Sequence, residues 1–351
     1  MKPKPISLAL QGGGALGAYT WGALDRLLED EGIEIAAVSG SSAGAMCAAV
    51  LADGLQEGGR EGARAELRRF WEGVAKAGHA SPYRRTPTIA FLSAFIPFWA
   101  QDHLALWADV ASRFASPYDF NPLNLNPLRD LLDELVDFER VRACEKLQLF
   151  IGATNVETGR SRIFTNAELS ADHILASACL PQLFQAVTIE GMSYWDGGFT
   201  GNPALFPLFK VEATRDIVIV QTHPVMREGV PRTGADITAR VNEINFNASL
   251  LSELRAIEFV ARLLDQQRLP EGRYRKMLVH NLSEGTPLTP LVLGADLNTD
   301  LSFFNDLFAV GRAAADRWLA AHFDALGQHS TVDLGAMFRD EPTADDAKPL
   351  R

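Results

Sequence analysis

The sequence predicts an α/β fold with a mainly parallel sheet and helices on its faces. The first observation is that strand-like and helix-like runs alternate over the first fifty residues, and this β-α-β-α order is typical of parallel sheets. The second is that the chain has 351 residues, 47% of them apolar, which suffices for a sizeable core. This length fits one large α/β domain or two smaller ones.

The N-terminal elements follow from the spacing of apolar side chains. Residues 6–10 and 34–39 are short apolar runs, which predict buried strands. Residues 16–32 carry apolar side chains at helical spacing, and residues 43–54 predict a helix rich in small side chains. A charged amphipathic helix is predicted over 60–78.

The composition changes after this helix. Residues 81–107 are proline-broken, aromatic and strongly apolar, and residues 116–132 are turn-rich, with three prolines and three asparagines. We therefore interpret 80–130 as an apolar insertion in the α/β framework and not as a further βα unit.

The regular pattern then returns and defines the organisation of the chain. The remaining predicted elements are strands at 147–158, 161–166, 216–223 and 275–282, a hairpin at 186–198, and helices at 170–181, 235–265 and 297–326. We expect residues 1–225 to form the α/β core and 226–338 a mainly helical extension packed on it. Residues 339–351 are predicted to be a flexible tail.

Charge, cysteines and the N-terminus narrow the class of protein. The net charge of −11 argues against nucleic acid as the main partner. Cys47, Cys144 and Cys179 are odd in number and not closely spaced, so we expect reduced thiols and no structural metal. Only about five apolar residues precede the first glycines, against ~7–15 in a secretory signal. No run approaches the ~20 apolar residues of a membrane span, and we expect a cytoplasmic protein.

A G-x-S-x-G pattern lies between the second strand and its following helix, at Gly40–Gly44. This is the position of a nucleophile elbow, in which glycines two residues before and after the serine relieve contacts with neighbouring backbone. The following helix directs its N-terminal dipole at the site. A plain Gly/Ser turn would contain the same residue types, but the strand–helix placement favours Ser42 as a nucleophile.

The glycine-rich stretch QGGGALGAY at 11–19 allows two interpretations. Gly12, Gly14 and Gly17 match the G-x-G-x-x-G dinucleotide fingerprint, which also requires an acid at the end of the second strand. Here the acid candidate is Glu34, at the start of that strand. The alternative is that the loop directs backbone N–H groups at the same sheet edge as Ser42 and stabilises an oxyanion.

The group that activates the serine is left open by the residues themselves. Asp196 ends the hairpin and precedes two glycines, which could aim its carboxylate into a site. His223 closes an apolar strand and follows both Ser42 and Asp196, in the Ser-Asp-His order of one class of hydrolases. A Ser–Asp dyad and this triad both agree with the sequence.

Three motifs in order resemble the patatin-like phospholipase family. They are GGGALG at 12–17, GSSAG at 40–44 and DGG at 196–198, and the resemblance covers residues 5–225. It implies a three-layer α/β/α fold and hydrolysis of lipid acyl esters through an acyl-serine intermediate. It also implies a dyad of Ser42 and Asp196, without metal, cofactor or histidine. The oxyanion donors would be the N–H groups of Gly12, Gly13, Gly14 and Ala43.

One loop residue departs from the family pattern. The family usually has Arg or Lys where this chain has Leu16, which weakens the case for an anionic headgroup there and favours a neutral ester or lysolipid. We expect residues 81–107, with Phe91, Phe95 and Trp99, to cap the site and contact lipid. The expected partners are thus a lipid or acyl-ester substrate, the inner membrane surface through peripheral contact, and a second copy of the chain.

Two other functions compete with a serine acyl hydrolase. The first is a non-catalytic lipid-binding protein on the same fold, and the second is a dinucleotide-binding oxidoreductase that uses the glycine loop. Covalent labelling of Ser42 by a fluorophosphonate would separate the hydrolase from both.

Overall fold

A computed structural model describes residues 2–80, 116–270, 273–285, 288 and 298–338. Most of the sequence-predicted elements lie within these ranges. The expected cap at 81–107, including Phe91, Phe95 and Trp99, and the expected tail at 339–351 lie outside the described residues.

The described residues form one eight-stranded sheet. Its strands are β1 (Lys4–Leu10), β2 (Ile33–Gly40), β3 (Gln148–Asn155), β4 (Ser161–Thr165), β5 (Val187–Ile189), β6 (Met192–Asp196), β7 (Asp216–Val220) and β8 (Leu278–Leu282). The order is β5-β6-β3-β2-β1-β7-β8, and β4 pairs with β3. The β3-β2-β1-β7-β8 pairs are parallel, and the β4, β5 and β6 pairs are antiparallel. The predicted mainly parallel α/β fold is therefore confirmed.

Helices of very different length connect these strands. The longer ones are α1 (Gly17–Glu29), α2 (Ala43–Ala80), α6 (Pro127–Leu135), α9 (Gly234–Asp265) and α10 (Leu301–His322). The shorter ones are α5 (Pro117–Phe120), α7 (Phe138–Arg142), α8 (Ala171–Ser177) and α11 (Leu334–Met337). The 3-10 helices are η1 (Gly14–Leu16), η3 (Asn166–Glu168), η4 (Gly197–Phe199), η5 (Phe206–Lys210) and η7 (Phe323–Ala325).

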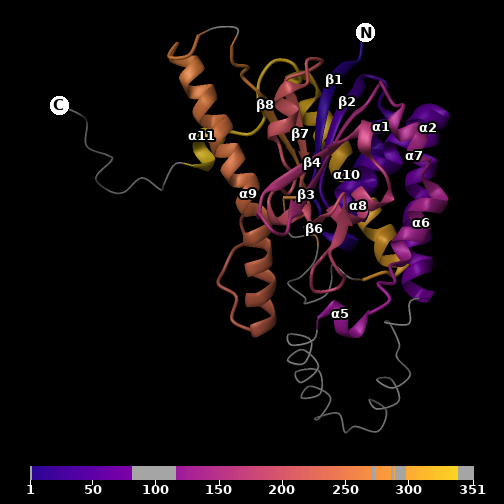
Figure 1. Cartoon of the computed structure of the whole chain (residues 1–351). Coiled ribbons are helices and arrows are strands. Elements are labelled where there is room, and N and C mark those ends of the chain that lie inside the picture. Colours follow the sequence, from indigo (N-terminus) through magenta and orange to yellow (C-terminus); the bar gives the residue numbers. More distant parts are fainter. Residues whose placement is uncertain (1, 81–115, 271–272, 286–287, 289–297, 339–351) are drawn as a thin grey trace.

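The sheet is covered on both faces, which gives three layers (Figure 1). Alternate strand residues serve different cores: Leu8 and Val218 face α1, α2 and α10, whereas Ala9 and Ile217 face α9 and η5. Because both faces are buried, the central strands are almost continuously apolar, as parallel strands usually are. Residues after 225 add β8 to the sheet and α10 to a helical layer.

Helix α10 packs very closely on α1. A Cβ on Gly22 would lie 2.0 Å from the carbonyl oxygen of Phe308, and one on Gly311 would lie 2.1 Å from that of Tyr19. Glycine at both positions therefore allows the two backbones to approach.

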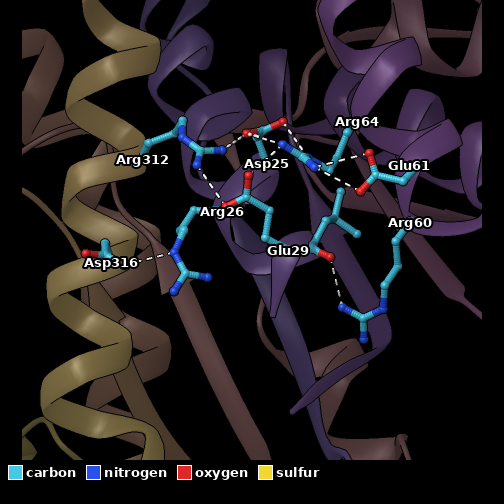
Figure 2. A network of polar contacts seen from close by, with 9 residues as sticks. Asp25, Arg26, Glu29, Arg60, Glu61, Arg64, Arg312 and Asp316 are labelled. Atoms are coloured by element: carbon cyan, nitrogen blue, oxygen red, sulfur yellow. Dashed lines mark hydrogen bonds and ion pairs between the residues drawn. The ribbon is translucent and has the colours of Figure 1, made fainter. Parts of the chain in front are cut away.

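An ion-pair network joins α1, α2 and α10 beside this contact (Figure 2). Arg64 of α2 donates to Asp25 (2.9 Å) and to Glu29 (2.6 Å) of α1. Arg312 of α10 reaches the same two carboxylates and lies 2.8 Å from Glu29. These contacts fix the C-terminal helix to the N-terminal half of the chain.

Two local features differ from the sequence prediction. The helices predicted at 43–54 and 60–78 both lie within α2 and are separated where Gly58 and Gly59 leave helical geometry, so the first difference is only that the second helix starts directly after this break. Helix α6 lies partly within the stretch predicted as turns, because Asn126 caps its first turn and Pro127 occupies its first position.

No membrane-spanning helix is found in the described part of the chain. None of its helices combines the length and the apolar character that crossing a bilayer requires.

Candidate active site

The sequence-predicted site residues meet at the carboxyl edge of the parallel strands. Leu10 of β1 pairs with Gly40 of β2 and with Val220 of β7, so these three strands end at the same level. The segments that follow them therefore lie side by side. The glycine loop follows β1, Ser42 follows β2 and His223 follows β7. This is the usual place for a ligand in an open α/β sheet.

The turn after β2 has the geometry of a nucleophile elbow. Ser42 has φ of 55°, a left-handed conformation that is rare for a non-glycine residue. A Cβ on Gly40 would lie 2.7 Å from the carbonyl oxygen of Gly44, and one on Gly44 would lie 2.3 Å from that of Leu10. Both glycines are thus required sterically, and the strain at Ser42 places its partly exposed side chain beyond the sheet edge.

The two serines of this turn have different environments. The hydroxyl of Ser41 is buried and donates to the carbonyl oxygen of Gly201 at 2.6 Å. Ser42 is anchored through its backbone, since its N–H donates to the carbonyl oxygen of Ser177 (3.1 Å) and lies 3.0 Å from the Ser177 hydroxyl. Ser41 therefore stabilises the turn, whereas Ser42 presents its hydroxyl to the site.

Asp196 is fully buried at the end of β6. Its backbone N–H donates to the carbonyl oxygen of Cys179 at 2.8 Å, and its carboxylate oxygen Oδ1 accepts the N–H of Gly198 at 2.7 Å. Burial raises the pKa of Asp196 from 3.8 to about 6, although hydrogen bonds from Gly198 and from the Ser42 hydroxyl lower it.

The Asp196 carboxylate and the Ser42 hydroxyl are neighbours but do not form a hydrogen bond of good geometry. Oδ2 of Asp196 is buried and has no partner with good hydrogen-bond geometry among the described residues. The Ser42 hydroxyl is nevertheless close enough to lower the pKa of this carboxylate. Catalytic hydrogen bonds are often long in a free enzyme and shorten when substrate binds. Oδ2 of Asp196 is therefore an acceptor that the hydrogen bonds among the described residues leave unused.

The glycine loop differs from the expectation at its first residue. The N–H of Gly12 donates to Oδ1 of Asn202 at 2.7 Å, so it is already used, and we withdraw Gly12 as an oxyanion donor. A Cβ on Gly12 would also lie 2.7 Å from Cβ of Ser42, which explains the glycine sterically. The N–H groups of Gly13, Gly14 and Ala43 find no acceptor within the described ranges.

A buried polar cluster lies on the other side of the loop. Oε1 of Gln11 accepts the backbone N–H groups of Thr222 and His223, each at 2.9 Å, and its amide nitrogen donates to Asn247 at 2.8 Å. The Thr222 hydroxyl donates to the carbonyl oxygen of Gly12 at 2.9 Å. This cluster connects β1, β7 and α9 around the loop.

His223 belongs to this cluster. Its Nδ1 lies 3.1 Å from the Thr222 hydroxyl, and its ring stacks on Phe246 of α9 with 6.1 Å between centroids. A Cβ on Gly13 would lie 2.6 Å from Cε1 of His223. The described contacts of the His223 ring are thus with Thr222, with Phe246 and with the glycine loop.

A cavity of about 480 Å³ opens beside Ser42, and small-molecule sites typically have ~300–1,000 Å³. Gly14, Ser42 and Ala43 form one part of its wall. The apolar lining includes Met46, Phe70, Trp71, Val74, Leu128 and Phe304. The cavity therefore joins Ser42 to an apolar space between α2, α6 and α10.

Leu16 does not line this cavity. Its side chain is 4% exposed and packs in the core that α1, α2 and α10 share. The departure from the family pattern at this position thus affects packing behind the loop, and Leu16 has no contact with the space beside Ser42.

The geometry also bears on the dinucleotide alternative and on metal binding. The turn after β2 is occupied by the elbow, and Glu34 lies at the start of that strand, away from the site edge. Among the described residues, no group of three or more His, Cys, Asp or Glu side chains is placed to hold a metal ion.

Several site residues were not identified from the sequence. Asn202, Thr222, Gln11 and Ser177 hold the loop or the elbow, but their partners are far away along the chain. Only Gln11, which adjoins the loop, and Asn202, six residues after Asp196, had any positional signal. A polar side chain close in sequence to a glycine turn is too common to be diagnostic.

Comparisons with known proteins identify a family. The family model described as patatin-like phospholipase matches residues 8–209. A comparison with curated proteins finds no match.

Among solved structures, VipD from Legionella pneumophila is 16% identical, with a TM-score of 0.42 over 91% of this chain and 67% of VipD. The type III effector ExoU, which a further structure places in Pseudomonas aeruginosa, is 20% identical, with a TM-score of 0.29. That alignment covers 91% of this chain and 53% of ExoU, so the chain spans about half of that protein.

Proposed function

We propose that this chain, which belongs to the patatin-like phospholipase family, hydrolyses lipid acyl esters through Ser42 and Asp196. The observation that carries the proposal is the left-handed Ser42, which opens on an apolar cavity while the buried Asp196 carboxylate lies beside its hydroxyl. Each part alone has a structural explanation, and together they provide a nucleophile, a base and an acyl site.

The first half of the reaction forms an acyl-enzyme. The Asp196 carboxylate takes the hydroxyl proton of Ser42 as Oγ attacks the ester carbonyl carbon. The carbonyl oxygen becomes an oxyanion, which the N–H groups of Gly13, Gly14 and Ala43 stabilise together with the N-terminus of α2. When the tetrahedral intermediate collapses, the alcohol leaves with the proton held by Asp196, and the acyl group stays on Ser42.

The second half returns the free enzyme. Asp196 is again ionised and takes a proton from a water molecule, which attacks the acyl-serine carbonyl from the side vacated by the alcohol. Collapse of the second intermediate breaks the bond between Oγ and the acyl carbon, and the proton returns from Asp196 to Ser42. The products are a carboxylic acid and an alcohol.

The cavity supports an acyl chain as the group bound next to Ser42. Its wall is mainly aliphatic and aromatic, with Asn121, Asn126, Asn298 and Thr299 among its polar members, and the described part of it contains no Lys, Arg, Asp or Glu side chain. Each methylene of an acyl chain buried there would contribute about 0.8 kcal/mol of favourable binding free energy. Leu125 lines this cavity and is exposed, and the exposed side chains of Tyr118 and Leu123 precede it closely in the chain. These three side chains support approach to a lipid surface.

The proposal is tested with nitrophenyl esters of increasing chain length, phospholipid vesicles and a fluorophosphonate probe. We expect Ser42→Ala to abolish labelling and ester hydrolysis while the melting temperature stays close to that of the wild type. Asp196→Asn should lower kcat by about 100-fold or more, because general-base catalysis typically contributes ~10²–10⁴.

Two serine variants serve as controls. Ser252 lies on α9, and among the described residues its hydroxyl donates to the carbonyl oxygen of Ala248, so Ser252→Ala should change neither labelling nor hydrolysis. Ser41→Ala should lose some stability and still be labelled. A wild-type protein that is folded but neither labelled nor active on any of these esters would contradict the proposed function.

A further inference from the structure

The Thr222 hydroxyl has a place in this site that the hydrolase mechanism does not explain. Thr222 follows β7, is 2% exposed, and donates its hydroxyl hydrogen to the carbonyl oxygen of Gly12 at 2.9 Å. That carbonyl belongs to the peptide unit whose N–H is the N–H of Gly13. A threonine more than two hundred residues away is therefore bonded to the oxyanion loop itself.

The hydrogen bonds around Thr222 assign its single hydroxyl hydrogen. Oε1 of Gln11 lies 3.3 Å from the hydroxyl but already accepts the backbone N–H groups of Thr222 and His223. Gly12 offers the shorter contact, at 2.9 Å. With the hydrogen on the Gly12 carbonyl, the hydroxyl oxygen is free to accept a hydrogen from Nδ1 of His223, which lies 3.1 Å away.

The sheet order determines where the opposite side of the peptide points. β1 lies between β2 and β7, so the loop after β1 has Ser42 on one side and Thr222 on the other. In a planar trans peptide the C=O and N–H bonds point in opposite directions. A Gly12 carbonyl bonded to Thr222 therefore turns the Gly13 N–H toward the side of Ser42.

We propose that Thr222 is a positioning residue that sets the Gly13 N–H as an oxyanion donor through its hydrogen bond to the Gly12 carbonyl. This inference rests on the proposed function, because it concerns the oxyanion of the same reaction. Without the hydroxyl, the peptide between Gly12 and Gly13 loses the contact that fixes its carbonyl, and glycine has no Cβ to limit the backbone angles on either side.

The size of the effect follows from what a misplaced donor costs. Complete loss of one oxyanion donor lowers kcat by ~10²–10³, and a shift of about 1 Å in a reacting group can cost ~10². We expect Thr222→Val to lower kcat by about 10- to 100-fold, because the donor is displaced but not removed. KM should change less than about twofold, since the ground-state ester makes little use of the donor.

The experiment compares Thr222→Val, Thr222→Ser and the wild type on a short soluble nitrophenyl ester. Thr222→Ser keeps the hydroxyl and should retain kcat within about threefold. The rate of fluorophosphonate labelling should follow kcat, because its phosphonyl oxygen occupies the same donors. Thr222→Ala repeats the test without the hydroxyl if Thr222→Val does not fold.

A matched control separates positioning from stability. Thr214 lies before β7, at the opposite edge of the sheet, is also buried, and bonds to Asp216 through its hydroxyl. Thr214→Val should lower the melting temperature without lowering kcat. An unchanged kcat in a folded Thr222→Val, or an equal loss in Thr222→Ser, overturns the inference while leaving the proposed function intact. An inactive and unlabelled wild type overturns both.

Discussion

The two glycine turns at the site, the elbow at 40–44 and the loop at 12–14, are held in different ways. In the elbow, Gly40 and Gly44 contact each other directly, and Gly44 also rests on the end of the neighbouring strand at Leu10. This local packing sets the shape of the turn, and hydrogen bonds from the Ser41 hydroxyl to Gly201 and from the Ser42 N–H to Ser177 anchor it. The serine conformation follows from that packing.

The loop at 12–14 is held by polar side chains from distant parts of the chain. Asn202 accepts the N–H of Gly12, Thr222 donates to its carbonyl, and Gln11 connects both sides to α9 through Asn247. The Asp196 carboxylate is also placed by remote contacts, with Cys179 and Gly198. The loop therefore depends on remote hydrogen bonds for its orientation, whereas the elbow combines the close packing of its own glycines with remote hydrogen bonds to Gly201 and Ser177.

The largest effect is expected where the packing of the elbow is broken. In Gly44→Ala the new Cβ would lie 2.3 Å from the carbonyl oxygen of Leu10, a backbone atom that cannot move away. We expect a loss of about 3 kcal/mol in the free energy of unfolding, the upper part of the usual overpacking range. Displacement of Ser42 should slow fluorophosphonate labelling by about 100-fold. Urea unfolding and labelling rates measure the two effects.

The control is a glycine in open space. A Cβ on Gly234, at the start of α9, would meet nothing within 4 Å. Gly234→Ala should therefore leave the labelling rate unchanged and the free energy of unfolding within about 0.5 kcal/mol of the wild type. If Gly44→Ala were as stable and as reactive as Gly234→Ala, the elbow would not depend on glycine packing.

This difference also explains which parts could be predicted from the sequence. The elbow is encoded locally, because glycines at fixed offsets between a strand and a helix favour this turn. Ser42 could therefore be predicted from the sequence alone. The alternation of strands and helices gave the parallel sheet for the same local reason. Asn202 and Thr222 could not be predicted, since their roles depend on which strands become neighbours. The loss of Gly12 as a donor has the same origin.

The second prediction concerns the buried carboxylate and its pH dependence. Burial raises the pKa of Asp196 from 3.8 to about 6, so the folded state holds a proton that the unfolded state has released between these values. The contribution of Asp196 to the free energy of unfolding is therefore most favourable below about pH 4, and it falls by ~3 kcal/mol as pH rises to 6. Asp196→Asn should remove this loss and stabilise the protein at pH 7.5 by up to ~3 kcal/mol.

Activity should change in the opposite direction with pH. The base must be ionised, so kcat/KM of the wild type should rise as pH increases through about 6.

Asp216 provides a control for the stability prediction, with the opposite sign. Burial raises the pKa of Asp216, but hydrogen bonds from His280 and Gly327 outweigh burial and hold the pKa below 3.8. Asp216→Asn should thus destabilise the protein at pH 7.5. Destabilisation by Asp196→Asn at that pH would show that the site does not oppose ionisation.

The smallest effect is expected at His223, which distinguishes the dyad from the triad. His223 is one hydrogen bond further from the loop than Thr222, and in His223→Asn the amide nitrogen can still donate to the Thr222 hydroxyl. We expect kcat to fall less than about threefold, whereas loss of a general base typically costs ~10²–10⁴. Steady-state kinetics on the soluble ester, measured for His223→Asn and Thr222→Val together, shows which of the two variants loses more kcat. If His223→Asn loses more activity than Thr222→Val, the histidine acts on the reacting atoms, and a triad replaces the dyad.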